Sequence, residues 1–560
     1  MGSVAPRARG ARNVTRSAPG APLRRRCAVR LRGVLLGAAI VAAAVPFAGA
    51  AGQAAGGPAL AGSYTAGPLR LAFDTMGVYR VSLNGVLAVE GGYEIHADTV
   101  VLHDRGGPRA CPADVAGTYA WKRSGGTLTL GAIADGCAGR QGALAREWAA
   151  VEGGAQALVG LTLIDGTGAP ARSGMTLLVE KGRIRDVFPD GAKPLPVGTE
   201  RADLRGRWVI PGLIDAHVHL ETDPSGSDGA AAVATRLRNA LLGGVTTVRD
   251  MGGDTRVLAG LARAAALNET VSPSVVYAAV FAGPEFFGDP RIVESTRGAT
   301  AGAAPWARAV RGDTDLRLAV AEAKGTGASA LKLYAALPAA ALVPLVGEAH
   351  RQGLAVWSHA ALFPARPSEV VDAGVDVVSH ASLLVWEAAA AMPSYTQRAA
   401  GDFARVPPTG GAIDALLKDM AQRGTILDAT LLVVSRPDQR AKGGEWASRV
   451  TGRAHELGVR IAAGTDGFIG DDNGDLPNLH EELALLVRAG LAPLEAISAA
   501  TSVAAAALDV ENDRGVLAPG MAADLVILER DPLVDIRNSR SILWVMKAGR
   551  RYSRSPVAAP

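Results

Sequence analysis

The chain has few of the features that mark several common protein classes. It contains 3 cysteines in 560 residues, and no apolar run after residue 50 is long enough to cross a bilayer. No glycine-rich dinucleotide-binding turn follows the first strand-like run of its central region. These absences argue against a membrane-embedded mature chain and against a doubly wound dinucleotide-binding fold.

An excess of positive charge is also absent once the first 50 residues are set apart. The formal net charge is +4, but residues 1–50 carry nine Arg and no acidic residue. The rest of the chain holds 49 basic and 54 acidic side chains, a net charge of −5. The sequence therefore predicts no nucleic-acid partner. Its length and its apolar fraction of 48% indicate two or three domains with at least one large core.

The first 50 residues have the order of parts that a secretory signal peptide has. A basic stretch at 23–32 precedes an apolar run at 34–45, and the small residues Ala48-Gly49-Ala50 follow. We expect cleavage after Ala50 and export to the periplasm or the outside of the cell, with no membrane attachment of the mature form. An uncleaved anchor is the alternative, and the choice between the Sec and Tat routes stays open. Cys27 precedes the apolar run and is badly placed for a lipid anchor.

Export gives the two remaining cysteines a predicted role. An oxidising compartment lets Cys111 and Cys137 pair, and closing that loop adds about 3 kcal/mol of stability. Two unpaired buried thiols are the alternative.

The mature chain divides into three predicted domains. Residues 62–148 show short alternating runs broken by Gly, which predict a small antiparallel β domain that looks like the lipocalin-like modules found ahead of hydrolases. Residues 155–209 and 515–555 have similar strand character on either side of one large unit, so we expect them to form a discontinuous β-sandwich. Between them, residues 210–510 alternate strand-like and Ala-rich helical stretches.

That alternation predicts an α/β fold of parallel strands with crossover helices, a (β/α)8 TIM barrel inserted in the β-sandwich. Eight strands are expected near residues 213, 246, 275, 331, 356, 376, 426 and 462.

Six residues able to bind a metal stand at the ends of these strand-like runs. His217 and His219 lie two apart, so both imidazoles point to one face of a strand. In a chain with nine His, a single His-X-His pair is common enough by chance that it does not by itself identify a metal site. The six together, however, occupy successive strand ends, where a parallel barrel places its active site. They are His217, His219, Lys332, His359, His380 and Asp466.

Four segments carry a resemblance to a known family. Residues 211–219 (PGLIDAHVH), 246–250 (TTVRD), 464–466 (GTD) and 515–526 together look like the metal-dependent amidohydrolase superfamily. The branch that contains imidazolonepropionase-like enzymes, prolidase-like dipeptidases and related carboxypeptidases is the most similar. The resemblance covers residues 157 to about 550.

The resemblance implies a centre with two divalent metal ions, which we expect to be Zn²⁺. His217, His219 and Asp466 would hold the first ion, and His359 and His380 the second. A carbamate formed from CO2 on Lys332 would bridge them, since an unmodified ammonium repels a dication. If Lys332 is unmodified, a mononuclear site of the four His and Asp466 is the alternative.

The family chemistry implies hydrolysis of an amide bond through a metal-bridging hydroxide, with Asp466 as the proton carrier. We expect a small-molecule substrate, dipeptide-like or an N-acyl amino acid. A cyclic amidohydrolase of imidazolonepropionase type is one alternative, and a non-catalytic exported binding protein on the same scaffold is another. The oligomeric state stays open.

Substrate contacts are harder to predict. Arg249, at the end of the second strand, is expected either to reach the substrate or to support the site. Tyr334 faces the same side as Lys332 and is a candidate substrate contact. His480 is a candidate residue lining the mouth of the active site. Substrate choice is expected in the long segments 279–329 and 381–424. In the first segment, Pro284-Glu285-Phe286-Phe287 and several Arg suit a carboxylate, and a solvated loop is the alternative.

Overall fold

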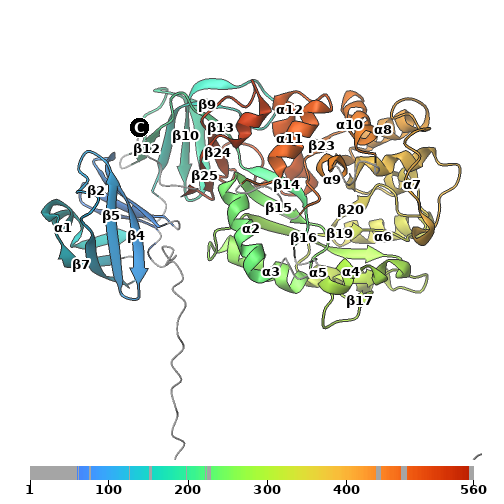
Figure 1. The fold of residues 1–560 in the computed structure, drawn as a ribbon, viewed down its shortest axis with the longest axis horizontal. Coiled ribbons are helices and arrows are strands. Elements are labelled where there is room, and N and C mark those ends of the chain that lie inside the picture. The colour runs from blue at the N-terminus through green and yellow to red at the C-terminus, as the bar shows by residue number, and fades with distance from the viewer. Residues whose placement is uncertain are drawn as a thin grey trace, which may run out of the picture. The chain divides into compact units, whose positions relative to one another are not determined.

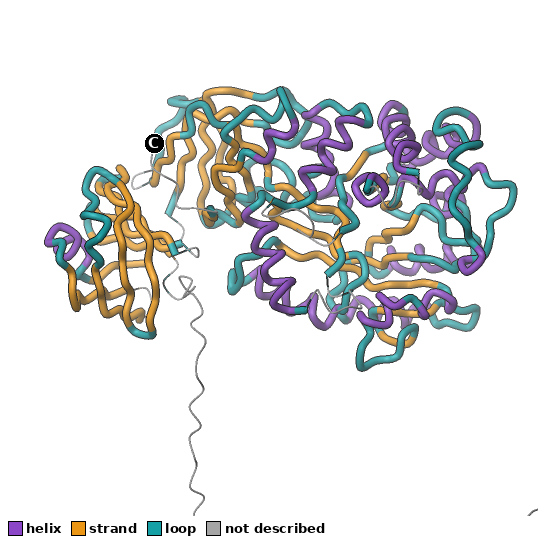
Figure 2. Tube along the Cα trace, in the orientation of Figure 1, coloured by secondary structure: helices purple, strands orange, loops and turns teal. Residues whose placement is uncertain are grey.

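The fold is described from a computed structural model (Figure 1). It describes residues 60–553 except 61, 75–76, 125–126, 151–153, 197–198, 221, 223–228, 437–442 and 468–475. The predicted signal peptide and Cys27 lie outside the described residues. Three β-sheets organise the described part of the chain, and Figure 2 shows in orange how their strands are grouped.

The first sheet is a closed antiparallel barrel in which each strand pairs with the next and β1 pairs with β8. Its interior is filled by a cluster of apolar residues that includes Tyr79, Tyr119 and Trp148. A disulfide joins Cys111 and Cys137, with 6.2 Å between their Cα atoms. The strands are β1 (Gly62–Ala66), β2 (Leu69–Phe73), β3 (Val78–Leu83), β4 (Val86–His96), β5 (Thr99–Gly106), β6 (Gly117–Ser124), β7 (Thr127–Asp135) and β8 (Glu147–Ala150), and the short helix α1 (Ala138–Leu144) precedes β8.

The second sheet draws its strands from the segments that precede and follow the parallel barrel in the sequence, in the order β11-β10-β9-β13-β24-β25-β26, with β12 also paired to β9. β13 is the junction, because it runs parallel to β9 and antiparallel to β24. The predicted pairing of segments before and after the barrel is therefore seen in one sheet. Its strands are β9 (Gln156–Leu163), β10 (Arg172–Glu180), β11 (Arg183–Pro189), β12 (Glu200–Asp203), β13 (Trp208–Pro211), β24 (Leu525–Leu528), β25 (Ile542–Lys547) and β26 (Arg550–Tyr552).

The third sheet is a nearly closed parallel barrel, and all eight predicted strand positions fall on its strands or within one residue of them. The last strand returns to the first through backbone hydrogen bonds from Ala216 N to Ala463 O and from Asp466 N to His217 O, both 2.9 Å. The strands are β14 (Leu213–Val218), β15 (Val245–Asp250), β16 (Ser274–Ala282), β19 (Ala330–Leu333), β20 (Ala355–His359), β21 (Val377–Ser379), β22 (Ile426–Asp428) and β23 (Ile461–Ala462); β17 (Ala303–Ala304) and β18 (Ala307–Ala309) extend the sheet beside β16.

Helices follow most of the barrel strands and pack outside them (Figure 1). Asp side chains begin several of them by accepting a backbone N–H, as Asp254 does for α3 and Asp315 for α5. The helices are α2 (Ala230–Leu242), α3 (Thr255–Ala266), α4 (Pro290–Ser295), α5 (Leu316–Gly325), α6 (Ala339–Arg351), α7 (Pro367–Asp372), α8 (Gly411–Arg423), α9 (Leu431–Ser435), α10 (Gly444–Glu456), α11 (Leu479–Arg488), α12 (Pro493–Ala499) and α13 (Ser502–Ala507), with 3-10 turns η1 (Pro284–Gly288), η2 (Ala381–Ala388), η3 (Tyr395–Gln397) and η5 (Ile536–Arg540).

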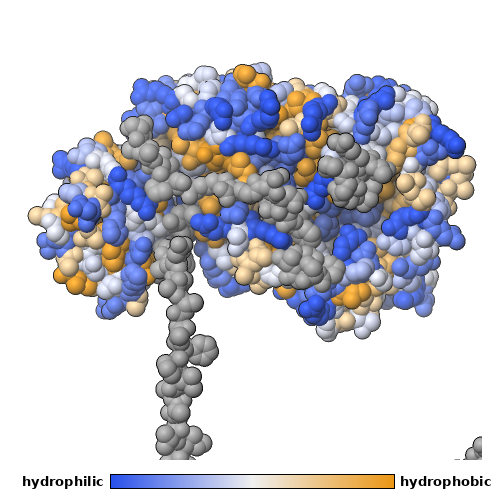
Figure 3. Space-filling view, viewed as in Figure 1, coloured by the Kyte–Doolittle hydropathy of each residue, from blue (hydrophilic) through white to orange (hydrophobic). Residues whose placement is uncertain are grey.

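The surface of the molecule carries a mixture of polar and apolar side chains. Hydrophilic side chains, blue in Figure 3, are spread over the visible face, with apolar ones between them. Among the described residues, no helix has the length and apolar character needed to cross a membrane.

Candidate metal centre

The six predicted metal-binding residues all lie at the carboxyl ends of the parallel strands. His217 is in β14 and His219 follows it, Lys332 is in β19, and His359 ends β20. His380 follows β21, and Asp466 comes shortly after β23. Since the carboxyl ends of all eight strands meet at one end of such a barrel, the fold brings these distant residues together.

The first group consists of His217, His219 and Asp466, whose ligand atoms all lie within 4.8 Å of one another. Asp466 Oδ1 is 3.1 Å from His219 Nε2 and 3.4 Å from His217 Nε2. Three donors at this spacing suit one divalent ion, which takes imidazole nitrogen and carboxylate oxygen together.

The second group, His359 and His380, adjoins the first through Asp466. The other carboxylate oxygen, Oδ2, is 3.6 Å from His380 Nδ1. The rings of His359 and His380 are 4.6 Å apart between centroids, and His380 is 5.1 Å from His217. One aspartate thus faces both groups, as a ligand or proton carrier at a two-ion centre would.

The ionisation of these histidines fits metal binding. Burial lowers the pKa of His217 and His359, and that of His380 to about 3, so the rings are neutral and offer lone pairs. The buried Nε2 of His217 has no hydrogen-bond partner among the described residues, although its Nδ1 has one. A buried nitrogen without a hydrogen bond is costly unless another ligand occupies it.

Lys332 lies beside this cluster with no exposed surface. Its Nζ donates to Ser379 Oγ at 3.2 Å, and its charge affects the pKa of His217, His359 and His380. Burial lowers the pKa of Lys332 itself to about 7. The neutral amine, which is the form that reacts with CO2, is therefore well populated at neutral pH.

Asp428 is a part of the site that the sequence analysis missed. It ends β22, is fully buried, and its Oδ2 accepts hydrogen bonds from His217 Nδ1 at 2.7 Å, Ser379 Oγ at 2.9 Å and Arg249 Nη2 at 3.1 Å. Such a carboxylate fixes the ring so that Nε2 faces the metal. The signal was available, because Ile426-Leu427-Asp428 is another short apolar run that closes on a ligand-type residue.

Asp215 is a second missed residue. It stands two before His217 on the same face of β14, so the alternation that revealed the His pair begins one step earlier. Its carboxylate accepts from Thr465 N at 3.0 Å and Thr465 Oγ1 at 2.9 Å, which holds the segment that carries Asp466. Burial raises the pKa of Asp215 to about 7.

The backbone at the cluster is unusual in three places. Asp466, His380 and Thr430 all have positive φ, at 50°, 72° and 48°. Left-handed backbone at non-glycine residues costs energy and gathers at functional sites. Gly464 serves the same region, because a Cβ there would collide with His217 and Asp428.

Arg249, expected either to reach the substrate or to support the site, and His480, expected at the mouth, are both buried. Arg249 is fully buried and donates to Ala216 O, to Ala507 O and to Asp428, so it supports the site from beneath. His480 is also fully buried, with Nε2 donating to Gly243 O and Nδ1 2.9 Å from Ser539 Oγ. Gly243 precedes β15, at the end of the barrel opposite the cluster, so His480 has no surface to offer a substrate.

Tyr334 lies where a substrate contact is possible. Its ring centroid is 4.6 Å from that of His359, and it lines a small cavity together with His219. Its predicted role stays a prediction.

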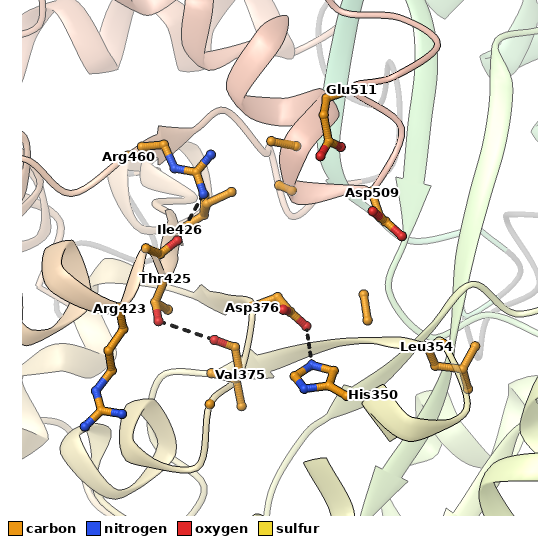
Figure 4. A pocket seen from close by; sticks show the side chains of 16 residues that line it. His350, Leu354, Val375, Asp376, Arg423, Thr425, Ile426, Arg460, Asp509 and Glu511 are labelled. Carbon is orange, nitrogen blue, oxygen red and sulfur yellow. Dashed lines mark hydrogen bonds and ion pairs between the residues drawn. The ribbon is translucent and has the colours of Figure 1, made fainter. Parts of the chain in front are cut away.

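A much larger cavity, of about 660 Å³, opens at the amino ends of the strands (Figure 4). Asp376, Thr425 and Arg460 on its wall each directly precede a strand. His350 is 2.9 Å from Asp376, and Thr425 donates to Val375 O. It is the opposite end from the cluster, and its size does not make it the reaction site.

Comparison with known proteins gives the chain its relatives. The sequence profile of the Amidohydrolase family matches residues 208–552. An uncharacterised protein of Mycobacterium bovis is 27% identical over 393 residues, which are 66% of this chain and 90% of that protein. An adenine deaminase of Paracoccus denitrificans is 41% identical over 59 residues, and this chain spans only 10% of its length.

Solved structures show the same fold. A provisionally identified prolidase of Bifidobacterium longum is 26% identical, with a TM-score of 0.53 over 73% of this chain and 96% of its own. A Xaa-Pro dipeptidase with methionine in its active site is 21% identical, with a TM-score of 0.57 over 71% of this chain and 100% of its own.

Proposed function

This chain belongs to the amidohydrolase family, a family of hydrolases that act on C–N bonds, and on that premise we propose that it hydrolyses the amide bond of a dipeptide-like or N-acyl amino acid substrate. The convergence of His217, His219 and Asp466 within 4.8 Å carries the proposal. Members of the family generally bind a divalent metal, and this donor set suits one.

In the full proposed centre, two Zn²⁺ ions would be bound. His217, His219 and Asp466 would hold one, His359 and His380 would hold the other, and a carbamate on Lys332 would supply anionic oxygens to both. When bound, such ions provide hydroxide at neutral pH and polarise the substrate carbonyl.

The chain's own residues supply orientation and proton transfer. Asp466 faces both histidine groups, so its carboxylate is placed to take the proton that the attacking water loses and to deliver it to the leaving nitrogen. Burial opposes ionisation of Asp466, but its contacts with His217, His380 and His219 outweigh burial and hold its pKa well below the usual range, so the carboxylate is ionised at neutral pH. Arg249 donates to Asp428, and Asp428 in turn accepts a hydrogen bond from His217 Nδ1. These contacts fix the imidazole of His217, so its Nε2 points in one direction.

The substrate class is supported by the neighbours that share the fold, a provisionally identified prolidase and a Xaa-Pro dipeptidase. Both names point to a bond next to an amino acid with a free carboxyl group. The proposed place of action is outside the cytoplasm, which rests on the signal-like order of residues 1–50.

The test is a hydrolysis screen of the mature chain supplied with Zn²⁺ and bicarbonate. We expect turnover of dipeptides or N-acyl amino acids that a chelator abolishes and Zn²⁺ restores. Cyclic amides are screened in parallel, since turnover of those alone would favour the imidazolonepropionase type. Less than one equivalent of tightly bound metal, with no turnover of any class, would favour the exported binding protein instead.

A further inference from the structure

Two loops that are far apart in the sequence meet beside the metal centre. Phe286 of η1 stacks on Tyr334, with centroids 4.9 Å apart and planes at 24°. Tyr395 of η3 packs edge-on against the same Phe286 at 5.8 Å. These loops belong to the segments 279–329 and 381–424, so the segments expected to choose the substrate do border the site.

The same region contains a small, partly open cavity of about 20 Å³, enough for roughly one water-sized group. Its wall joins a proposed metal ligand to the first loop. It includes His219, Phe286, Tyr334 and Arg291, the last from α4. A group that enters this cavity therefore lies next to the metal centre and next to one guanidinium.

Arg291 is held on one edge and open on the other. Its Nε and Nη2 donate to the two carboxylate oxygens of Asp289 at 3.1 and 3.0 Å. Among the described residues nothing accepts a hydrogen bond from Nη1, and the side chain is 56% exposed. Arg291 also interacts electrostatically with Tyr334 and Asp466, and it shares the wall of this cavity with His219.

We propose that the free edge of Arg291 binds the α-carboxylate of the substrate, with Phe286 and Tyr334 as the apolar wall beside it. A guanidinium offers several donors in a fixed plane, and a carboxylate is the acceptor that fits them. Asp289 is a positioning residue, since it fixes the guanidinium without reaching the substrate. The inference rests on the proposed function, because it names which amides that activity prefers.

The kinetic test uses two substrates with the same scissile bond, N-acetyl-L-phenylalanine and its C-terminal amide. We expect the wild-type enzyme to prefer the acid, and Arg291→Gln to lower kcat/KM on the acid by about 30-fold, the value of a charged hydrogen bond. The same change is expected to alter the amide by less than about threefold, since a neutral amide does not use the charge. Arg297→Gln, an exposed arginine of the same segment, is the matched control and leaves both values unchanged. Equal losses on acid and amide, or no preference in the wild-type enzyme, would overturn the proposal.

A binding test separates this inference from the proposed function. The Asp466→Asn holoenzyme is titrated calorimetrically with N-acetyl-L-phenylalanine and with its amide, with and without Arg291→Gln. We expect the acid to bind at least about tenfold more tightly than the amide, and Arg291→Gln to abolish that difference. Equal or absent binding of the two probes, or a preference that survives Arg291→Gln, contradicts the role of Arg291. Lack of turnover by the wild-type enzyme contradicts the proposed function and leaves this binding result to decide on Arg291.

Discussion

The two halves of the candidate metal centre are supported in different ways. The half formed by His217 and His219 rests on ionised carboxylates, because Asp428 holds the ring of His217 and Asp466 faces both imidazoles. The half formed by His359 and His380 has Lys332 beneath it, and the segment next to His380 is held by Glu482.

The connection from Glu482 to His380 runs through a short turn. Glu482 accepts the backbone N–H of Leu431 at 2.9 Å and of Leu432 at 2.7 Å. The preceding residue, Thr430, places its Oγ1 2.9 Å from His380 Nδ1. The pKa of Asp428 is lowered, largely by His217 after the opposing effect of burial, whereas burial raises that of Glu482 to about 8.

The comparison teaches that the two halves share one carboxylate and differ in the second. Asp466 faces both halves, and Asp428 supports only the first, through His217. The second half gains an anionic ligand of its own only if Lys332 is modified. We therefore expect the first ion to bind more tightly than the second, with the difference depending on CO2.

Removing the carboxylate that the two halves share should have the largest effect. Asp466→Asn keeps the size of the side chain and loses the proton carrier, so kcat is expected to fall by about 10³-fold or more. Metal analysis of the same protein is expected to show much of the first ion retained. Near-normal kcat in this variant would remove Asp466 from proton transfer.

Lys332→Met separates the halves. It keeps an unbranched side chain in the buried strand and cannot form a carbamate, so bound zinc should fall from two ions to one and kcat/KM by about 100-fold. Bicarbonate should stimulate the wild-type enzyme after CO2 removal and leave the variant unchanged. A variant that binds two ions normally would contradict the bridge.

Asp428→Asn weakens the first half while every proposed metal ligand keeps its own side chain. His217 loses its charged acceptor, and metal affinity is expected to drop by about 10- to 100-fold, measured by competition with a chelator. Asp419→Asn, which alters an exposed partner of Arg423 on α8, serves as the control. Unchanged affinity in a folded Asp428→Asn protein would show that the ring of His217 needs no carboxylate.

Glu482→Gln sharpens the comparison through pH. The pKa of Glu482 is about 8 in the fold and near 4.5 when unfolded, so its ionisation favours the unfolded chain as pH rises between those values. The unfolding free energy of the wild type relative to Glu482→Gln should therefore fall by about 1.4 kcal/mol for each pH unit from 5 to 8. Denaturant titrations at four pH values measure this, with Glu481→Gln on the same helix as control. Parallel pH profiles for wild type and Glu482→Gln would mean that Glu482 is ionised in the fold.

The barrel was predictable because its strands are short apolar runs at regular spacing, each closing on a polar residue. The same pattern located the six proposed ligands, since chain position fixes which end of a parallel strand a residue occupies. Residues whose role depends on the direction of a side chain were not predictable. Arg249 and His480 both stand near strand ends or helix starts, yet one points beneath the site and the other toward the far end of the barrel.

Asp428, Asp215 and Glu482 show the other limit. Each acts on a ligand or its neighbouring segment from a distant part of the chain, and only the packed fold shows which group it contacts. Arg291 is one of several arginines in segment 279–329, where the sequence alone showed no recognisable motif. Its place on the wall of the small cavity, together with Tyr334 and His219, distinguishes it from the others.

The pairing of β13 with β24 also means that β13 cannot complete its sheet until most of the chain has been synthesised. Trp208 pairs with Leu528, so a strand that leaves the ribosome early waits for a partner near the carboxyl terminus. At about 5–20 residues per second, synthesis of the intervening stretch takes tens of seconds. During that interval one edge of β13 offers open backbone groups to any other strand. A chain that ends before β24 therefore keeps this edge of β13 unpaired and open to mispairing.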